Sequence, residues 1–392
     1  MKLKLLLTSC LFSILSSHAQ ENKIYTSIDE ALQNPNQVYE INLNYQVKLN
    51  SLPKDFSKLT NLKKLTFVSL KCTTIPKEIL ALPNLEELTI NNAGITEITA
   101  DIISLKKLKK LDLSYNVVSN ISNEIGQLNN LEILHLNNNW VKKIPLGVYS
   151  ITSLKNLSMY ECGISGAIPE SLGNMKNLEN IELSGNNSIT SLPQSIGNLT
   201  SLRRINIGGN KVKTLPTSIS KLTQLETLYL YDNQFTAVPK EISTMTELTS
   251  LLLSGNNISV LPDFVFNCTK LFRLEIYGNQ IKQIPEEISK LKNLTDFSCG
   301  QNSLTALPNS IGQLTKLRIL SLTSSSVETF PSSMCNLKNI VCINFGDTPI
   351  KTVPDCFSNL TTLKRFFIND NIETQIDQIK KMMPNCGNIR KL

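Results

Sequence analysis

The chain reads Leu225-Glu-Thr-Leu-Tyr-Leu-Tyr-Asp-Asn233-Gln-Phe-Thr-Ala-Val-Pro239, and 23 residues later it reads Leu248-Thr-Ser-Leu-Leu-Leu-Ser-Gly-Asn256-Asn-Ile-Ser-Val-Leu-Pro262. The two stretches place the same kinds of residue at the same positions. The register starts 14 times, with a shortened copy at Leu363. The full copies begin at Val38, Leu62, Leu85, Leu108, Leu131, Leu154, Leu178, Leu202, Leu225, Leu248, Leu271, Leu294, Leu317 and Ile340. A fixed period of this length indicates a solenoid of stacked coils.

Each position of the repeat has a physical role. The Leu-x-x-Leu-x-Leu segment places alternate side chains on one face of a short strand, so the leucines point inward and the residues between them outward. The Ile/Leu-Pro pair ends the extended segment, because proline has no backbone donor. The trailing Ile-x-x-Leu spacing predicts a short helix or 3₁₀ turn on the outside. The predicted fold is therefore an α/β solenoid with a parallel sheet on its concave face.

An asparagine occupies the ninth position of most repeats, where the chain turns inward after the strand. A buried side-chain amide there would satisfy backbone groups of adjacent coils. The asparagines are Asn116, Asn139, Asn186, Asn210, Asn233, Asn256, Asn279, Asn302 and Asn371. The position departs from asparagine at Leu70, Ala93, Cys162, Ser325 and Thr348. We expect Leu70 and Ala93 to make the N-terminal end irregular.

This pattern resembles the leucine-rich-repeat family. The motif Leu-Pro-x-x-Ile-Gly-x-Leu-x-x-Leu occurs at Leu192–Leu202 and Leu307–Leu317 and is similar to Ras-group and bacterial surface repeats. The segment Ser165-Gly-Ala-Ile-Pro169 is similar to plant receptor repeats. The resemblance runs from Val38 to the C-terminus. It implies a right-handed horseshoe with helices or 3₁₀ turns on the convex face, and a protein that binds a partner. It specifies the fold much better than the function.

The sequence divides into four parts. Residues 1–19 have lysines, a short apolar run and small residues before Gln20, a pattern typical of a secretory signal peptide. Residues 20–37 contain the capping box Ser27-Ile-Asp-Glu30, which predicts a helix that caps the array. The repeat array spans residues 38–371. In residues 372–392, Ile372, Ile376, Ile379 and Met383 recur at helical spacing and predict a second cap, with Lys380, Lys381, Arg390 and Lys391 in solvent.

The signal pattern predicts an exported protein, either secreted or held at the cell surface or in the periplasm. Cys10 follows a run resembling a lipoprotein box, but its apolar segment is short for lipidation. The sequence beyond residue 19 has no stretch of the ~18 apolar residues that a membrane span needs. The formal net charge of +7 is spread over repeats in which Lys and Glu alternate, which argues against a nucleic-acid partner.

Nine cysteines occur in the chain, and Cys10 would leave with the signal. Cys72, Cys162, Cys268 and Cys299 fall at core positions, which is typical of small buried apolar side chains. The others gather near the C-terminus, at Cys335, Cys342, Cys356 and Cys386. A Cys356–Cys386 disulfide would staple the end cap, but spacing does not fix the pairing.

The sequence offers little for catalysis or metal binding. His135 is the sole histidine beyond the signal, and Asp112 and Ser158 occupy its position in the adjacent repeats. This column resembles a catalytic triad, but parallel side chains on an open sheet imply no oxyanion hole. Asp347 and Asp370, with Asn369 and Asn371 nearby, offer oxygens suited to calcium, although solvated acids are the simpler interpretation. We therefore predict no enzyme activity, metal or cofactor.

The outward strand residues predict where a partner binds. Tyr229, Tyr231, Leu252 and Tyr277 come from three adjacent repeats, and Arg204, Asp232, Arg273 and Glu275 surround them. Exposed tyrosine beside arginine is typical of interface hot spots, although tyrosine is also a common strand residue. Gly208, Gly209, Gly255 and Gly278 would lower the surface enough to admit a side chain. A second candidate patch is Phe367, Arg365, Asp347 and Asp370.

The sequence as a whole predicts a monomeric, exported, bacterial interaction module that binds a protein, or a glycan, on its concave face. The alternative is an intracellular signalling scaffold of the Ras-group type, which would apply if residues 1–19 were not a signal. N-terminal sequencing separates the two, because only export would produce a chain that starts at Gln20. The sequence does not identify the partner, or say whether the protein is attached to the surface or released.

Overall fold

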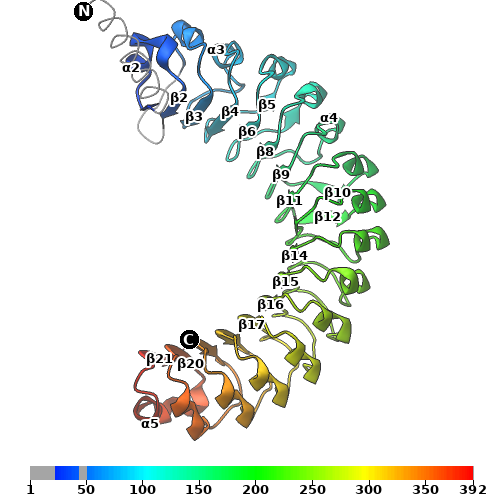
Figure 1. The fold of residues 1–392 in the computed structure, drawn as a ribbon, viewed down its shortest axis with the longest axis vertical. Helices are drawn as coiled ribbons and strands as arrows, with labels where there is room; N and C mark the ends of the chain where they lie inside the picture. Colours follow the sequence, from blue (N-terminus) through cyan, green and yellow to red (C-terminus); the bar gives the residue numbers. More distant parts are fainter. Residues whose placement is uncertain (1–22, 44–50, 392) are drawn as a thin grey trace, which may run out of the picture. The chain divides into compact units, whose positions relative to one another are not determined.

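The computed structural model describes residues 23–43 and 51–391, so the signal-peptide prediction for residues 1–19 lies outside the described residues. The chain forms two compact units. The first extends to Ser165 and includes Ser171–Asn186, and the second comprises Gly166–Glu170 and the chain from Asn187 onward. Within each unit, strands line one side of a stack of coils and short helical turns line the other (Figure 1).

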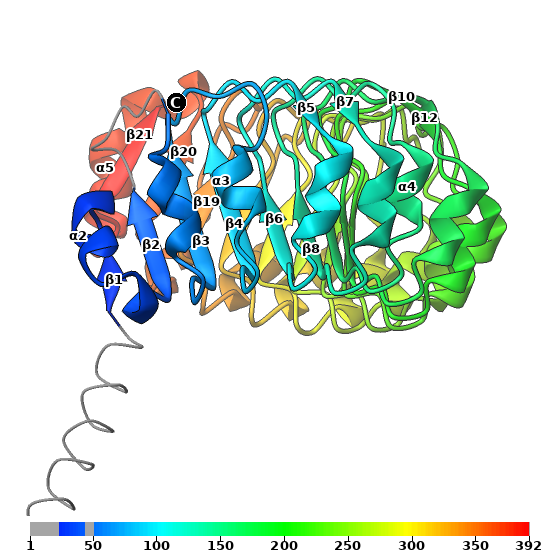
Figure 2. The same cartoon turned by 90° about the horizontal axis from the view of Figure 1, so that it is seen from above.

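The first unit places eight parallel strands side by side. They are β1 (Ile24–Tyr25), β2 (Glu40–Leu43), β3 (Lys64–Val68), β4 (Glu87–Asn91), β6 (Lys110–Asp112), β8 (Ile133–His135), β9 (Asn156–Ser158) and β11 (Asn180–Glu182). Its helices α3 (Lys77–Leu80) and α4 (Leu146–Tyr149) lie on the outer surface (Figure 2). The 3₁₀ helices are Pro35–Gln37, Lys54–Lys58, Ala100–Ser104, Asn123–Gln127 and Glu170–Asn174. A separate pair, β5 (Glu97–Ile98) and β7 (Asn120–Ile121), forms a small sheet.

The second unit continues the same architecture with nine parallel strands. They are β13 (Arg204–Asn206), β14 (Thr227–Tyr229), β15 (Ser250–Leu252), β16 (Arg273–Glu275), β17 (Asp296–Ser298), β18 (Ile319–Ser321), β19 (Cys342–Asn344), β20 (Arg365–Ile368) and β21 (Asn388–Lys391). Its 3₁₀ helices are Gln194–Asn198, Thr217–Lys221, Lys240–Thr244, Asp263–Asn267, Glu286–Lys290, Asn309–Gln313, Ser332–Asn336, Asp355–Asn359 and Asp370–Gln375. The short strands β10 (Ser165–Ala167) and β12 (Ser188–Ser191) pair with each other.

The strands stack in strict register. Leu228 on β14 lies opposite Ile205 on β13 and Leu251 on β15, and all three side chains are fully buried. The alternate residues, such as Tyr229, face away from the core, as the Leu-x-x-Leu-x-Leu pattern predicts. The 23-residue period thus produces identical coils whose leucines form one continuous core within each unit. The predicted fold, an α/β solenoid with a parallel sheet and short outer turns, is confirmed.

The ninth-position asparagines bond each coil to the one before it. Asn256 donates from its amide to the carbonyls of Leu230 and Leu253, each at 3.0 Å, and accepts from the Phe235 N–H at 3.0 Å. Leu230 and Phe235 belong to the preceding coil. The same pattern recurs at Asn116, Asn139, Asn233, Asn279 and Asn302. The amide satisfies backbone groups that burial would otherwise leave unpaired.

Where asparagine is replaced, the substitutes behave differently. Cys162 donates from its thiol to the Leu136 carbonyl, and Thr348 donates from its hydroxyl to the Phe345 carbonyl. Leu70 and Ala93 are simply buried. The prediction for Asn371 was wrong in part, because this residue is exposed and only donates to the Thr348 carbonyl. The buried amide is Asn369, since the chain there turns directly into a 3₁₀ helix.

Both ends carry a strand that the repeat pattern does not contain. β1 pairs with β2, and β21 pairs with β20, so each terminal repeat strand gains a neighbour. At the N-terminal end, α2 (Ile28–Gln33) begins after Ser27, whose hydroxyl accepts from the Glu30 N–H at 3.4 Å. At the C-terminal end, α5 (Ile376–Met382) follows the last 3₁₀ helix and buries Ile379.

The disulfide joins Cys335 to Cys356, so the Cys356–Cys386 pairing considered from the sequence is wrong. Cys335 and Cys356 lie on consecutive outer 3₁₀ helices, and their Cα atoms are 5.7 Å apart. Cys386 lies instead near Cys342 on β19; burial, with a smaller contribution from the Cys342 thiol, raises the pKa of the Cys386 thiol. The stacking of outer turns therefore decides the pairing. Cys162, Cys268 and Cys299 are buried as predicted, whereas Cys72 is half-buried.

Candidate partner-binding face

Five of the eight predicted contact residues line one hollow on the outward face of the second unit, with a volume of ≈ 500 Å³. These five are Tyr231, Asp232, Leu252, Glu275 and Tyr277. The remaining lining residues are Ser254, Gly255, Gly278 and Gln301. We call this feature the tyrosine hollow. It lies over β15 and β16 because strict register aligns the same repeat positions on neighbouring strands.

Leu252 does not project as an exposed contact, which corrects the sequence prediction. Only 7% of its surface is accessible, although it alternates outward on β15. Its register partners are the larger residues Tyr229 and Glu275, which flank it on both sides. Leu252 therefore forms part of the floor of the tyrosine hollow.

Gly208 admits a side chain, but the side chain is the protein's own. A Cβ atom placed on Gly208 would lie 2.3 Å from the Cζ atom of Tyr231, so the Tyr231 ring rests directly on this glycine. Gly255 receives Asp232 in the same way, since a Cβ there would overlap the carboxylate, at 1.9 Å from its Oδ1 atom. The glycines thus seat two lining side chains of the tyrosine hollow and hold them in place.

The charged residues predicted around the hollow differ in their partners and in their distance from it. Arg273 donates from Nε to the Glu275 carboxylate at 2.7 Å, so these charges offset each other on one strand. The Tyr229 hydroxyl lies 3.4 Å from the Ser250 hydroxyl, beside the hollow but outside its lining. Arg204 lies on β13 opposite Thr227, two strands from β15, so the structure does not bring it to the hollow.

Sequence reasoning missed Gln301 and gave no role to Ser254. Gln301 occupies the eighth repeat position, the same as Asp232, Gly255 and Gly278, so reading that column would have found it. The hydroxyl of Ser254 is fully covered and has no hydrogen-bond partner in the described chain. A ligand in the hollow would reach this hydroxyl only after the Ser254 side chain rotates toward it.

The second candidate patch is partly covered. Phe367 on β20 lies opposite Arg390 on β21, whose guanidinium sits 5.4 Å from the centre of the Phe367 ring. The Asn369 side chain donates to backbone carbonyls and accepts from the Ile372 N–H. The C-terminal strand thus covers part of Phe367, whereas Asp347, Arg365 and Asp370 are exposed.

The Asp112, His135 and Ser158 column forms as the register predicts, but its hydrogen bonds do not form a relay. His135 Nδ1 lies 3.7 Å from the Asp112 carboxylate. The Ser158 hydroxyl donates to the Asn137 side chain at 2.7 Å, so its proton is directed away from His135. Burial acts to raise the pKa of Asp112, but hydrogen bonds from His135 and Ser114 outweigh it and leave the pKa lowered.

Cysteine nucleophiles and metal sites find no support in the described ranges 23–43 and 51–391. Burial raises the pKa of the Cys162 and Cys268 thiols to about 11, so both stay protonated at neutral pH. These ranges contain no group of three or more histidine, cysteine or acidic residues arranged to hold a metal ion.

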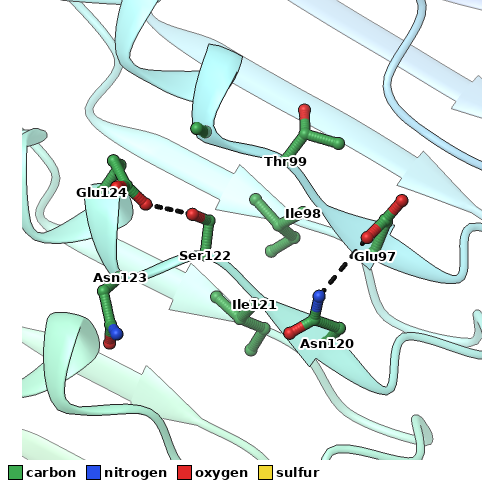
Figure 3. Close-up of a pocket in the computed structure, with 9 residues that line it drawn as sticks. Glu97, Ile98, Thr99, Asn120, Ile121, Ser122, Asn123 and Glu124 are labelled. Carbon is green, nitrogen blue, oxygen red and sulfur yellow. Dashed lines mark hydrogen bonds between the residues drawn. The ribbon is translucent and has the colours of Figure 1, made fainter.

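A second hollow of ≈ 420 Å³ lies beside β5 and β7 in the first unit (Figure 3). Several of its polar side chains are already bonded to one another or to the backbone. Asn120 donates to Glu97 at 3.4 Å, Ser122 donates to Glu124, and Asn123 accepts from the Gly147 N–H at 2.9 Å. This hollow therefore offers few unpaired groups to a ligand, in contrast to the tyrosine hollow.

Comparisons with known proteins agree with the architecture. A family model described as a leucine-rich repeat region matches residues 100–188 and 180–252, and a second, described as a leucine rich repeat, matches residues 246–304. None of the curated proteins compared with the chain matches it. No helix within the described part of the chain is long and apolar enough to cross a bilayer.

Solved structures extend the likeness to nearly the whole chain. A leucine-rich-repeat protein from Leptospira interrogans is 30% identical, with a TM-score of 0.85, over 94% of this chain and 99% of that one. The plant peptide hormone receptor RGFR1, solved in complex with RGF2, is 25% identical with a TM-score of 0.70, over 88% of this chain and 61% of the receptor. An internalin from Listeria monocytogenes is 23% identical with a TM-score of 0.70, over 80% and 88% of the two chains, and shares the fold.

Proposed function

Because this chain belongs to the leucine-rich-repeat family, we propose that it is an interaction module that binds a protein partner over the tyrosine hollow. Proteins of this family are generally non-enzymatic interaction modules. The observation that carries the proposal is the hollow itself, which combines two tyrosine rings, a covered apolar floor and an unpaired hydroxyl on the outward sheet face.

Three physical features support binding at this place. Tyrosine supplies a large contact area and loses little conformational freedom on binding, which is why it dominates many interfaces. Tyr231 is already seated on Gly208, so its ring needs little reorganisation when a partner arrives. The RGFR1 receptor, which is solved with a peptide hormone, favours a polypeptide over a glycan as the partner.

Replacing Tyr231 and Tyr277 together by alanine is expected to weaken partner binding by roughly a thousandfold, at about 2 kcal/mol for each hot-spot ring. Clones from a displayed random peptide library, selected on the wild-type chain, would be compared on both proteins by surface plasmon resonance. Folding should stay intact, because both side chains are only partly buried. Thermal unfolding by circular dichroism checks this point.

The matched control is Tyr115→Ala, since Tyr115 is 52% exposed, belongs to the first unit and does not line the hollow. It should bind the selected clones as the wild type does. Equal binding to the double variant and the wild type would move the site elsewhere, and recognition of sugars alone by the wild type would make the partner a glycan.

We also propose that the protein is exported from a bacterial cell, to be secreted or held at its surface or in its periplasm. The supporting observations are the signal pattern of residues 1–19 and the Cys335–Cys356 disulfide, since disulfides persist in oxidising compartments. N-terminal sequencing of the chain from its native host should begin at Gln20. A chain that retains Met1 would instead support the intracellular scaffold.

A further inference from the structure

The tyrosine hollow exists because small residues occupy two repeat positions where the flanking coils carry larger side chains. At the seventh repeat position, the small residue Ser254 lies between Tyr231 and Tyr277 on the flanking coils. At the eighth position, two consecutive glycines, Gly255 and Gly278, lie between Asp232 and Gln301. The Asp232 side chain reaches over Gly255, while Gly278 carries no side chain, and the hollow of ≈ 500 Å³ has room for a long side chain of a partner.

The hollow carries one uncompensated negative charge. Glu275 is neutralised by Arg273 on its own strand, through contacts of 2.5 and 2.7 Å. The Asp232 carboxylate makes no ion pair or side-chain hydrogen bond with the residues that the structure describes, and it rests against Gly255 at the margin of the hollow. An ionised carboxylate at the margin of a partly enclosed space attracts a cation more strongly than it would in open solvent.

The walls and floor suit an aliphatic stem that ends in a cation. Leu252 provides a nearly buried apolar surface, and Tyr231 and Tyr277 contribute aromatic side chains to the lining. Aromatic rings attract cations through their electron-rich faces. At the far end, the Gln301 side chain offers an acceptor to a group with several N–H donors.

We propose that the tyrosine hollow takes a lysine or arginine side chain of the partner polypeptide, with its stem over Leu252 and its charge beside Asp232. This proposal rests on the function proposed above and specifies the chemistry of that site. A neutral sugar ring fits less well, because it gains nothing from the uncompensated Asp232 carboxylate.

The test uses the exported chain with carbon-13 labels in its leucine methyl groups. The Leu252 methyl resonance, assigned with Leu252→Val, reports on the floor of the hollow. The probes are Nα-acetyl-lysine methylamide, Nα-acetyl-arginine methylamide, the neutral norleucine analogue and a set of methyl glycosides. We expect at least one cationic probe to shift the Leu252 resonance at millimolar concentration, with an affinity roughly fivefold or more above that of norleucine.

Asp232→Asn is the informative variant, since it removes the charge and keeps the shape. Asp232 has a φ of 49°, and asparagine tolerates this left-handed conformation as well as aspartate does. The variant should lower the affinity for the cationic probe to that for norleucine, and leave the norleucine affinity unchanged. Asp263→Asn, on an outer 3₁₀ helix, is the matched control and should change neither.

The outcomes separate this inference from the proposed function. Equal binding of the cationic and neutral probes, a shift with glycosides alone, or no effect of Asp232→Asn overturns the cationic site. If library clones still lose binding in the double tyrosine variant, the interaction module stands without its cationic ligand. If those clones do not need the tyrosines and no probe shifts Leu252, both proposals fall.

Discussion

The Leu228→Asp variant is expected to lose about 5 kcal/mol of unfolding free energy, which is enough to disrupt the second unit. Leu228 is fully buried between Ile205 and Leu251. The substitution removes a packed side chain and leaves an unpaired carboxylate between stacked strands, and each effect alone costs several kcal/mol. Denaturant titrations followed by circular dichroism, and proteolysis of the native protein, would measure the loss.

The control for this variant is Thr227→Asp, at the adjacent residue of the same strand. Thr227 faces outward, and its register partner Arg204 is a cation. A carboxylate there stays solvated, so we expect a change within about 0.5 kcal/mol. Equal destabilisation by the two substitutions would contradict the inward and outward alternation from which the binding face is derived.

Asn256→Ala is expected to cost about 3 kcal/mol, although it removes no apolar contact of note. The substitution leaves the Phe235 N–H without its acceptor, in a region that water does not reach. The Leu230 and Leu253 carbonyls each lose one donor and keep a second, from the Asn233 and Asn279 amides. Buried groups left unpaired each cost on the order of 1–3 kcal/mol. Two of the affected groups lie in the preceding coil, so the loss should extend into that coil as well.

Hydrogen exchange followed by mass spectrometry would locate this effect. Peptides that contain Leu230 and Phe235 should lose protection together with the peptide that contains residue 256. The neighbouring variant Asn257→Ala should change little, because Asn257 is exposed and makes one long side-chain contact of 3.5 Å with Gln280. Similar unfolding midpoints for the two variants would argue against the asparagine ladder as a source of stability.

The repeat predicts the core almost completely, because one short pattern fixes strand, turn and outer segment together. Leu228 and Asn256 lie where their repeat positions predict. The repeat pattern could not predict the two terminal strands, because β1 and β21 contain no copy of it. They pair with the array through backbone hydrogen bonds. The Cys335–Cys356 pairing also depends on how neighbouring outer turns stack, which residue spacing alone does not reveal.

The sequence predicted which strands carry the candidate site, but it did not predict how deeply each side chain is buried there. Tyr231 and Tyr277 gather as their columns require, since register is a property of the period. Leu252 was misjudged because the exposure of an outward residue depends on the size of its neighbours, here Tyr229 and Glu275. Gln301 was overlooked because its contribution depends on the absence of side chains at Gly255 and Gly278.

The contact between Gly208 and Tyr231 means that a residue outside the hollow controls the position of a side chain that lines it. The Tyr231 ring keeps its orientation because Gly208, on the neighbouring coil, has only a hydrogen atom as its side chain. A methyl group at Gly208 would displace the ring. Evolution could therefore retune recognition through a position that never meets the ligand. Mutational scans restricted to interface residues would overlook this kind of control. Exchanging single coils between related leucine-rich-repeat proteins would alter the surface where the exchanged coils meet.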